Sequence, residues 1–124
     1  MGESRSPQGI EENLKKALAE LLVLALLHRR EYYALELTTA LAEHSGGAIR
    51  ITFPYAILYR MTEQGYIQEL PRRKSPDGRR RQYFGITESG RRYFDQMREI
   101  YEKFTAGVGR VLSAARPEEE GEPT

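Results

Sequence analysis

The chain has 124 residues, of which 40% are hydrophobic and 30% are charged, and its formal net charge is +1. This length and apolar content fit one domain with a single compact core. Because the sequence contains no cysteine, disulfides, thiolate metal sites and a cysteine nucleophile are excluded. The longest apolar run, residues 21–27, is far shorter than the roughly 18 residues that a membrane span needs. The N-terminus also lacks the pattern of a signal peptide, so we expect a cytoplasmic protein without a membrane segment.

The charge is distributed unevenly along the chain. Between Arg72 and Arg92 there are eight basic residues and only two acidic ones, Asp77 and Glu88. The end of the chain, residues 116–124, has one arginine and four glutamates. This distribution predicts a polyanionic partner for the middle of the chain.

The N-terminal half has the pattern of three helices. Residues 1–9 are small and polar and predict a flexible arm, and from Ile10 apolar residues recur at spacings of three and four. Around Leu27 this first helix is apolar on every side, which indicates that it is buried. A second helix is predicted over residues 32–44 and ends at Gly46-Gly47. Its expected inward residues are Leu35, Leu37, Ala40 and Leu41.

The third helix is expected after a short extended segment. Residues 49–51 alternate and suggest a strand, and Thr52 can then cap a helix that has Pro54 near its first turn and stops at Gly65. A hairpin follows, because residues 66–70 and 82–86 are rich in strand formers. Between them, residues 75–78 read Ser-Pro-Asp-Gly, which is a strong turn signal.

The C-terminal part predicts one long amphipathic helix over residues 88–113, with Thr87 as its cap and an acidic disordered tail over residues 114–124. The resulting fold class is mainly α with a small β-hairpin. Three helices, a basic hairpin and a further helix are the order of a winged helix-turn-helix, which we expect over residues 10–87. In that fold the third helix lies in a major groove of DNA and the hairpin, or wing, follows the phosphate backbone.

The wing gives the sharpest functional signal. Six cations flank its turn, so folding the hairpin brings like charges together, which is unfavourable without an anionic partner. A merely solvated loop is the alternative, but the position after a helix-turn-helix pattern favours phosphate contacts. The six wing cations are Arg72, Arg73, Lys74, Arg79, Arg80 and Arg81.

These segments resemble a known family. Residues 55–61 followed by Gly65-Tyr66-Ile67 are similar to the recognition-helix signature of PadR-like regulators, roughly Y-x-x-L-x-R-L and then G-L-I. Residues 79–90 resemble the wing and exit of that family, and residues 21–27 resemble its opening helix. The resemblance covers about residues 14–105. It departs at Thr52-Phe53-Pro54, where the family often has Gly-Thr-Leu, and at residues 33–36, where Tyr-Ala-Leu-Glu replaces Tyr-Gly-Tyr-Glu.

The resemblance implies a sequence-specific transcriptional regulator. It implies a homodimer on a palindromic operator, usually a repressor, with release by a small apolar or aromatic effector in some members. The long apolar stripe of the last helix independently predicts a dimer, because a monomer would leave it in water. Folding of this helix back over its own core is the alternative. The expected interface residues are Leu14, Leu18, Phe94, Met97, Ile100, Tyr101, Phe104 and Val108.

The third helix supplies the expected base contacts. Thr52, Phe53, Tyr55, Tyr59 and Arg60 are the candidates, together with the six wing cations. The alternative to a DNA contact is packing in the core for Tyr55 and a surface salt bridge for Arg60. We expect neither an enzyme nor a bound cofactor or metal, since no catalytic motif, phosphate loop or cluster of metal ligands occurs. The rival function is a winged-helix module that binds protein and not DNA.

Overall fold

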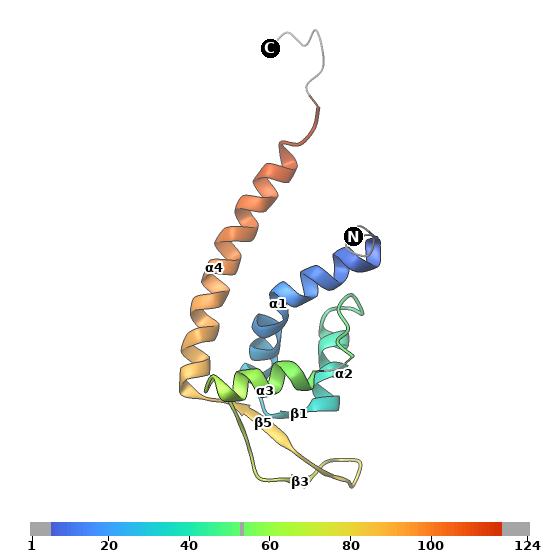
Figure 1. Cartoon of the computed structure of the whole chain (residues 1–124), viewed down its shortest axis with the longest axis vertical. Coiled ribbons are helices and arrows are strands. Elements are labelled where there is room, and N and C mark those ends of the chain that lie inside the picture. The colour runs from blue at the N-terminus through green and yellow to red at the C-terminus, as the bar shows by residue number, and fades with distance from the viewer. Residues whose placement is uncertain (1–5, 53, 118–124) are drawn as a thin grey trace.

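The computed structural model describes residues 6–52 and 54–117. Within them, three helices and a small sheet form the body, and a long last helix leaves it (Figure 1). None of the described helices is long and apolar enough to cross a membrane. The elements in chain order are α1 (Pro7–Arg29), β1 (Tyr32–Tyr33), α2 (Ala34–His44), α3 (Tyr55–Glu63), β2 (Ile67–Glu69), β3 (Arg73–Lys74), β4 (Arg80–Arg81), β5 (Tyr83–Ile86) and α4 (Glu88–Ser113).

Helix α1 begins earlier than its apolar pattern indicates. The Ser6 side chain accepts a hydrogen bond from the Gly9 N–H at 2.9 Å, and Pro7 occupies the first turn, where its missing N–H costs nothing. Residues 7–9, predicted as part of an arm, are therefore helical, whereas residues 1–5 of that arm lie outside the described residues. The C-terminal half of α1 is the centre of the core, as predicted, and Val23 and Leu24 are fully buried.

The segment predicted as the start of the second helix is instead a strand. Tyr32 and Tyr33 form β1, which pairs antiparallel with β5, and α2 starts at Ala34. The helix ends at His44, and Gly46 and Gly47 just after it both have positive φ and stop it, as predicted. Leu35, expected to face inward, is 58% exposed, because it lies two residues before the buried Leu37 and so on nearly the opposite side of the helix.

The connection from α2 to α3 is a loop, so the predicted strand over residues 49–51 is wrong. The Ile49 N–H donates to the Ser45 side chain at 2.9 Å instead of to a neighbouring strand. The prediction that Thr52 caps α3 is also wrong, since Pro54 is the N-cap and no side chain caps this helix. The Pro54 carbonyl accepts the Leu58 N–H at 3.0 Å.

The wing consists of two small sheets in series. Strand β5 lies between β1 and β2, and its residue Phe84 faces both Tyr32 and Glu69. Farther out, β3 and β4 pair so that Arg73 is opposite Arg81. The predicted hairpin is thus confirmed, although its outer part is built from the cations themselves. The turn depends on Gly78, which has a φ of 87°.

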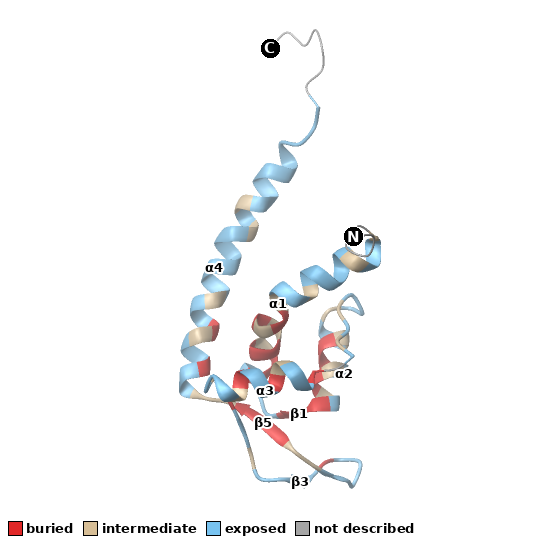
Figure 2. Ribbon diagram, viewed as in Figure 1, coloured by how far each residue is buried: buried red, intermediate tan, exposed pale blue. Residues whose placement is uncertain are grey.

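Helix α4 has the predicted bounds and cap. The Thr87 hydroxyl accepts the Gly90 N–H at 2.9 Å. The first turns pack against α1, and Phe94 is buried there, with its ring centroid 5.1 Å from that of His28. The rest of α4 extends beyond the body and is mostly exposed (Figure 2). The predicted tail lies partly outside the described residues, which end at Pro117.

Candidate nucleic-acid interface

Two tyrosines stand out from the surface of α3. Tyr55 and Tyr59 are 52% and 56% exposed, and their ring centroids are 6.3 Å apart. Leu58 and Met61 take the inward side of the helix and are buried. Core packing, the alternative considered for Tyr55, is therefore excluded, and both rings are available to a partner.

The tyrosines line a cavity between α3, the start of α2 and the wing. We call this cavity of about 350 Å³ the tyrosine notch. The exposed Leu35 contributes to it and is a candidate binding residue that the sequence reasoning missed. The sequence did contain evidence for this, because a residue two positions before the inward Leu37 lies on nearly the opposite side of a helix. The notch is lined by Tyr33, Ala34, Leu35, Tyr55, Tyr59, Glu69, Arg72, Arg80, Arg81, Gln82 and Phe84.

Two of the six wing cations form ion pairs with carboxylates of the protein itself. Arg73 forms a 2.9 Å ion pair with Glu31, and its guanidinium lies 3.6 Å from the centroid of the Tyr83 ring. Arg81 pairs with Asp77 at 2.7 Å and lies over the ring of Tyr33. Such contacts fix the hairpin against the body of the protein.

The other four cations are not neutralised in this way. Within the described part of the chain, no carboxylate forms an ion pair with Arg72, Lys74, Arg79 or Arg80, and all four are exposed. Lys74 and Arg80 are directly paired across the strands, where like charges repel. The outer wing therefore concentrates positive charge for which a row of phosphates is the natural partner.

The turn at the wing tip is held by Asp77. Its carboxylate accepts hydrogen bonds from the Ser75 hydroxyl, from the Arg81 guanidinium at 2.7 Å and from the Arg79 N–H at 3.1 Å. These bonds, that of Ser75 above all, hold the pKa of Asp77 well below its ordinary value. The carboxylate thus stays ionised and orders the loop from which the cations extend.

Arg60 is directed towards the body of the protein. Its Nε donates to the Glu20 carboxylate of α1 at 3.1 Å. The same glutamate accepts a 3.5 Å hydrogen bond from the Tyr93 hydroxyl of α4, and burial raises the pKa of Tyr93. The structure therefore has the salt bridge that was the alternative for Arg60. Thr52 is exposed just before α3, and Phe53 lies outside the described residues.

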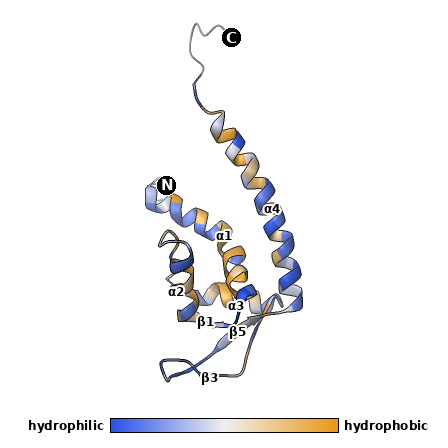
Figure 3. Cartoon of the chain, turned by 180° about the vertical axis from the view of Figure 1, so that it is seen from behind, coloured by the Kyte–Doolittle hydropathy of each residue, from blue (hydrophilic) through white to orange (hydrophobic). Residues whose placement is uncertain are grey.

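The residues predicted for the dimer interface divide into two groups. Phe94 is 6% exposed and belongs to the core of this chain, so its assignment to an interface is corrected. Met97 and Leu18 are half-buried. Leu14 on α1 is 59% exposed. Apolar residues recur along the far half of α4 (Figure 3). They are exposed, and we call them the distal apolar stripe. It comprises Ile100, Tyr101, Phe104, Val108, Val111 and Leu112.

Among the described residues, side chains that bind metal do not gather. Among residues 6–52 and 54–117, no group of three histidine or acidic residues could hold a metal ion. The imidazole of His44 contacts Arg29, and that of His28 contacts Arg91. The arrangement of the site thus rests on cations, tyrosines and apolar side chains.

Solved structures of transcriptional regulators have the same fold. A PadR-like regulator from Bacillus cereus is 24% identical, with a TM-score of 0.70 over 81% of this chain and 96% of that one. A regulator from Streptococcus is 25% identical, with a TM-score of 0.70 over 80% and 96%. One from Clostridium thermocellum is 21% identical, with a TM-score of 0.70 over 79% and 96%. The sequence matches no curated protein.

A family model links the sequence to the same group. The model described as the transcriptional regulator PadR-like family matches residues 23–96, which is more than half of the chain. The match includes residues 23–29 of α1, the helix-turn-helix and the whole wing. The resemblance seen in the sequence and the winged-helix fold are both confirmed. The chain belongs to the PadR-like family of transcriptional regulators and is a DNA-binding regulator, not an enzyme.

Proposed function

We propose that the protein is a cytoplasmic repressor that binds a palindromic operator as a homodimer. The observation that carries this proposal is the tyrosine notch, where exposed rings of α3 adjoin cations of the wing that lack a carboxylate partner among the described residues. An α-helix fits into the major groove of DNA, so exposed rings on α3 can contact base edges there. Cations on the two-stranded wing can reach the adjoining phosphates.

Tyr55, Tyr59 and Leu35 are the candidates for reading sequence. A tyrosine hydroxyl can bond a base edge, and an apolar side chain can contact the methyl group of thymine. Arg72, Lys74, Arg79 and Arg80 supply affinity without sequence information, since phosphates are the same at every step of the duplex. Arg73, Arg81 and Arg60 contribute mainly by holding the surface in shape, because each is paired within the protein.

The distal apolar stripe supports the homodimer. Phe104 is 70% exposed and Val111 is 69% exposed, which is unfavourable for a monomer in water. Pairing of two such stripes by a two-fold axis would present two α3 helices, and a two-fold protein matches a palindromic site. Leu14 of α1 is also exposed and could extend this contact.

Repression and release are the remaining parts of the proposal. The family resemblance implies repression, in which a bound dimer excludes other proteins from the operator. Phe104, Val108 and Val111 also help to line an open cavity of about 660 Å³ on α4, and an apolar or aromatic effector could bind in a part of it that the partner helix leaves uncovered. Such an effector releases DNA only if it binds one arrangement of the two wings better than another.

Selection of bound duplexes from a random pool tests the proposed function. We expect a palindromic consensus, and binding whose logarithm falls linearly with the logarithm of the salt concentration. Tyr59→Ala should change the consensus more than the affinity for random DNA. A protein that neither enriches a sequence nor binds duplexes in a salt-dependent manner would instead be a winged-helix module for protein partners.

A further inference from the structure

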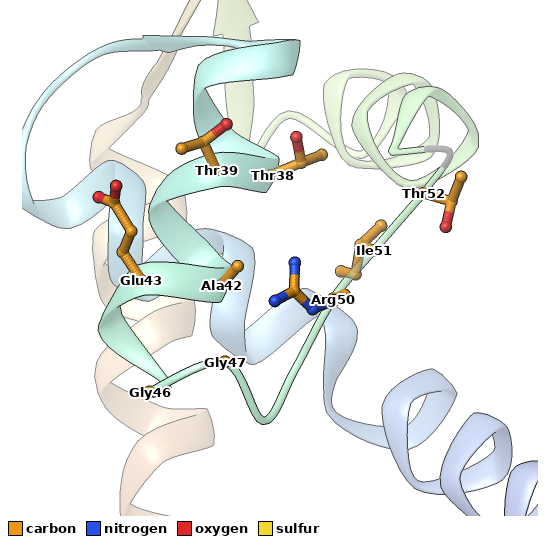
Figure 4. Close-up of a pocket in the computed structure, with 9 residues that line it drawn as sticks. All are labelled: Thr38, Thr39, Ala42, Glu43, Gly46, Gly47, Arg50, Ile51 and Thr52. Atoms are coloured by element: carbon orange, nitrogen blue, oxygen red, sulfur yellow. The ribbon is translucent and has the colours of Figure 1, made fainter.

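A second hollow lies beside α2, away from the wing. It is an open cavity of about 610 Å³ between α2 and the segment that leads to α3 (Figure 4). No wing residue contributes to it. Its lining residues are Thr38, Thr39, Ala42, Glu43, Gly46, Gly47, Arg50, Ile51 and Thr52.

Arg50 is the cation of this cavity. Its guanidinium points towards α2, and a Cβ at Gly47 would be only 3.8 Å from its Nη2 atom. Within the described part of the chain its side chain forms no ion pair, and the carboxylate of Glu43 points away from it (Figure 4). The main chain at Arg50 is held in place, because its carbonyl accepts a 2.8 Å hydrogen bond from Lys15.

The cavity is continuous with the proposed DNA surface. Leu35, Thr38, Thr39 and Ala42 lie at helical spacings of three, four and seven, so they share one side of α2. Leu35 belongs to the tyrosine notch and the others line the cavity, so this side of α2 joins the two hollows. Thr52, at the other border of the cavity, leads directly into α3.

The donors in the cavity indicate what it can hold. The hydroxyls of Thr38 and Thr39 both donate to the Leu35 carbonyl, at 2.7 and 3.2 Å, which leaves the Arg50 guanidinium and the Thr52 hydroxyl as side-chain donors of the lining. A guanidinium matches the geometry of a phosphate with two parallel hydrogen bonds. A single cation in an open hollow is a weak site for a free anion, but it suffices for a phosphate that other contacts already hold nearby.

We infer that Arg50 binds a backbone phosphate of the operator, so that the duplex is held at two borders of α3, by the wing and by the α2–α3 loop. The inference rests on the proposed function. A second cation, Lys16, lines an adjoining hollow together with Arg50 and Thr52, which extends the positive surface in the same direction. Lys15 adds less, because Glu12 pairs with it at 2.9 Å.

The test compares salt dependence of binding among matched variants. Binding to a labelled duplex of about three helical turns is measured at several salt concentrations. Arg50→Ala should lower the slope of log affinity against log salt by about 0.9 per protomer, or about 1.8 for a dimer. Arg50→Lys should keep the slope, because the charge remains. Arg98→Ala removes the same charge from the exposed surface of α4 and should leave the slope unchanged.

The outcomes separate this inference from the proposed function. If Arg50→Ala has the same slope as Arg98→Ala while Arg79→Ala with Arg80→Ala lowers it, the wing binds DNA and Arg50 does not. If the unaltered protein shows no salt-dependent binding to duplexes, the proposed function itself fails. Thermal unfolding of each variant checks that the fold is intact, which we expect because Arg50 is exposed.

Discussion

Gly90 lies where α4 passes the chain that enters β2, and there is no room for a side chain. A Cβ built there would collide with the Tyr66 carbonyl oxygen and lie 2.9 Å from Cγ1 of Ile86. The same crossing is fastened by the Thr87 hydroxyl, which donates to the Gly65 carbonyl at 2.7 Å. A single glycine thus sets how closely α4 approaches the root of the wing.

Gly90→Ala should lower the free energy of unfolding by about 2 kcal/mol, because backbone atoms cannot move aside without strain. This loss of stability is the opposite of the usual effect, because alanine within a helix is favoured over glycine by about 1 kcal/mol. Gly109→Ala is the control, because no atom lies within 4 Å of its Cβ position, and it should stabilise the protein. Denaturant unfolding measures both, and a Gly90→Ala protein as stable as the original would contradict the expected collision.

The lowered pKa of Asp77 predicts how the turn at the wing tip responds to acid. The pKa of Asp77 in the folded protein is lowered from an ordinary value of 3.8. The stabilisation that its carboxylate gives the turn is therefore complete above pH 3.8, and it is lost only as the pH falls through the lowered pKa of the folded protein. The Arg79 amide signal in an NMR titration should therefore stay constant down to pH 3.8 and change only below it. Asp77→Asn should remove this transition. A midpoint near 3.8 would show that the three hydrogen bonds do not persist in solution.

At the scale of elements, the wing divides into cations that are paired with a carboxylate and cations that have no carboxylate partner among the described residues. Arg80→Ala should lower the salt slope of DNA binding by about 0.9 for each phosphate that the arginine neutralises. Arg73→Ala should leave that slope nearly unchanged and instead speed amide hydrogen exchange in β3 and β4, because its contacts with Glu31 and Tyr83 fasten the hairpin. An equal reduction of the slope in the two variants would contradict this division.

The elements also show which features the sequence could predict. The bounds of α4 follow from a cap and an amphipathic pattern, which are both local signals. Strand β1 has only two residues, and its pairing with β5 far along the chain is not visible locally. The helical spacing of the apolar residues that follow therefore led to the prediction of a helix from residue 32, although tyrosine itself favours strands.

The same reasoning applies to the candidate site. The concentration of cations beside a turn is visible in the sequence. The sequence does not show which arginines are paired within the protein, because the partners of Arg73, Arg81 and Arg60 are mostly distant in the chain. Glu20 and Arg60, for example, are 40 positions apart. The burial of Phe94 within a stripe that is otherwise exposed likewise depends on where α4 leaves α1.

At the scale of the whole molecule, the length of α4 beyond the core predicts the assembly. Phe104→Asp should give a monomer in sedimentation at micromolar concentration without unfolding the protein, because Phe104 is 70% exposed. Affinity for a palindromic duplex should then fall on the order of a hundredfold, since the two halves no longer bind together.

Ala106→Asp adds the same charge on the side of α4 nearly opposite Phe104 and should remain dimeric. Shortening the chain after Glu102 offers a second route to the monomer, because it keeps Phe94 and the turns of α4 that complete the core. A shortened protein that still sediments as a dimer would assign the interface to another surface.

The pairing of β1 with β5 has a consequence for how DNA is recognised. Because β1 runs directly into α2, the root of the wing and the helix-turn-helix are joined by main-chain hydrogen bonds and not by a hinge. The angle between the wing and α3 is then a property of the sheet. A duplex whose grooves do not suit this angle has to bend or twist to fit, and the energy of that distortion depends on its base steps. We therefore expect discrimination among operators at positions that no side chain touches.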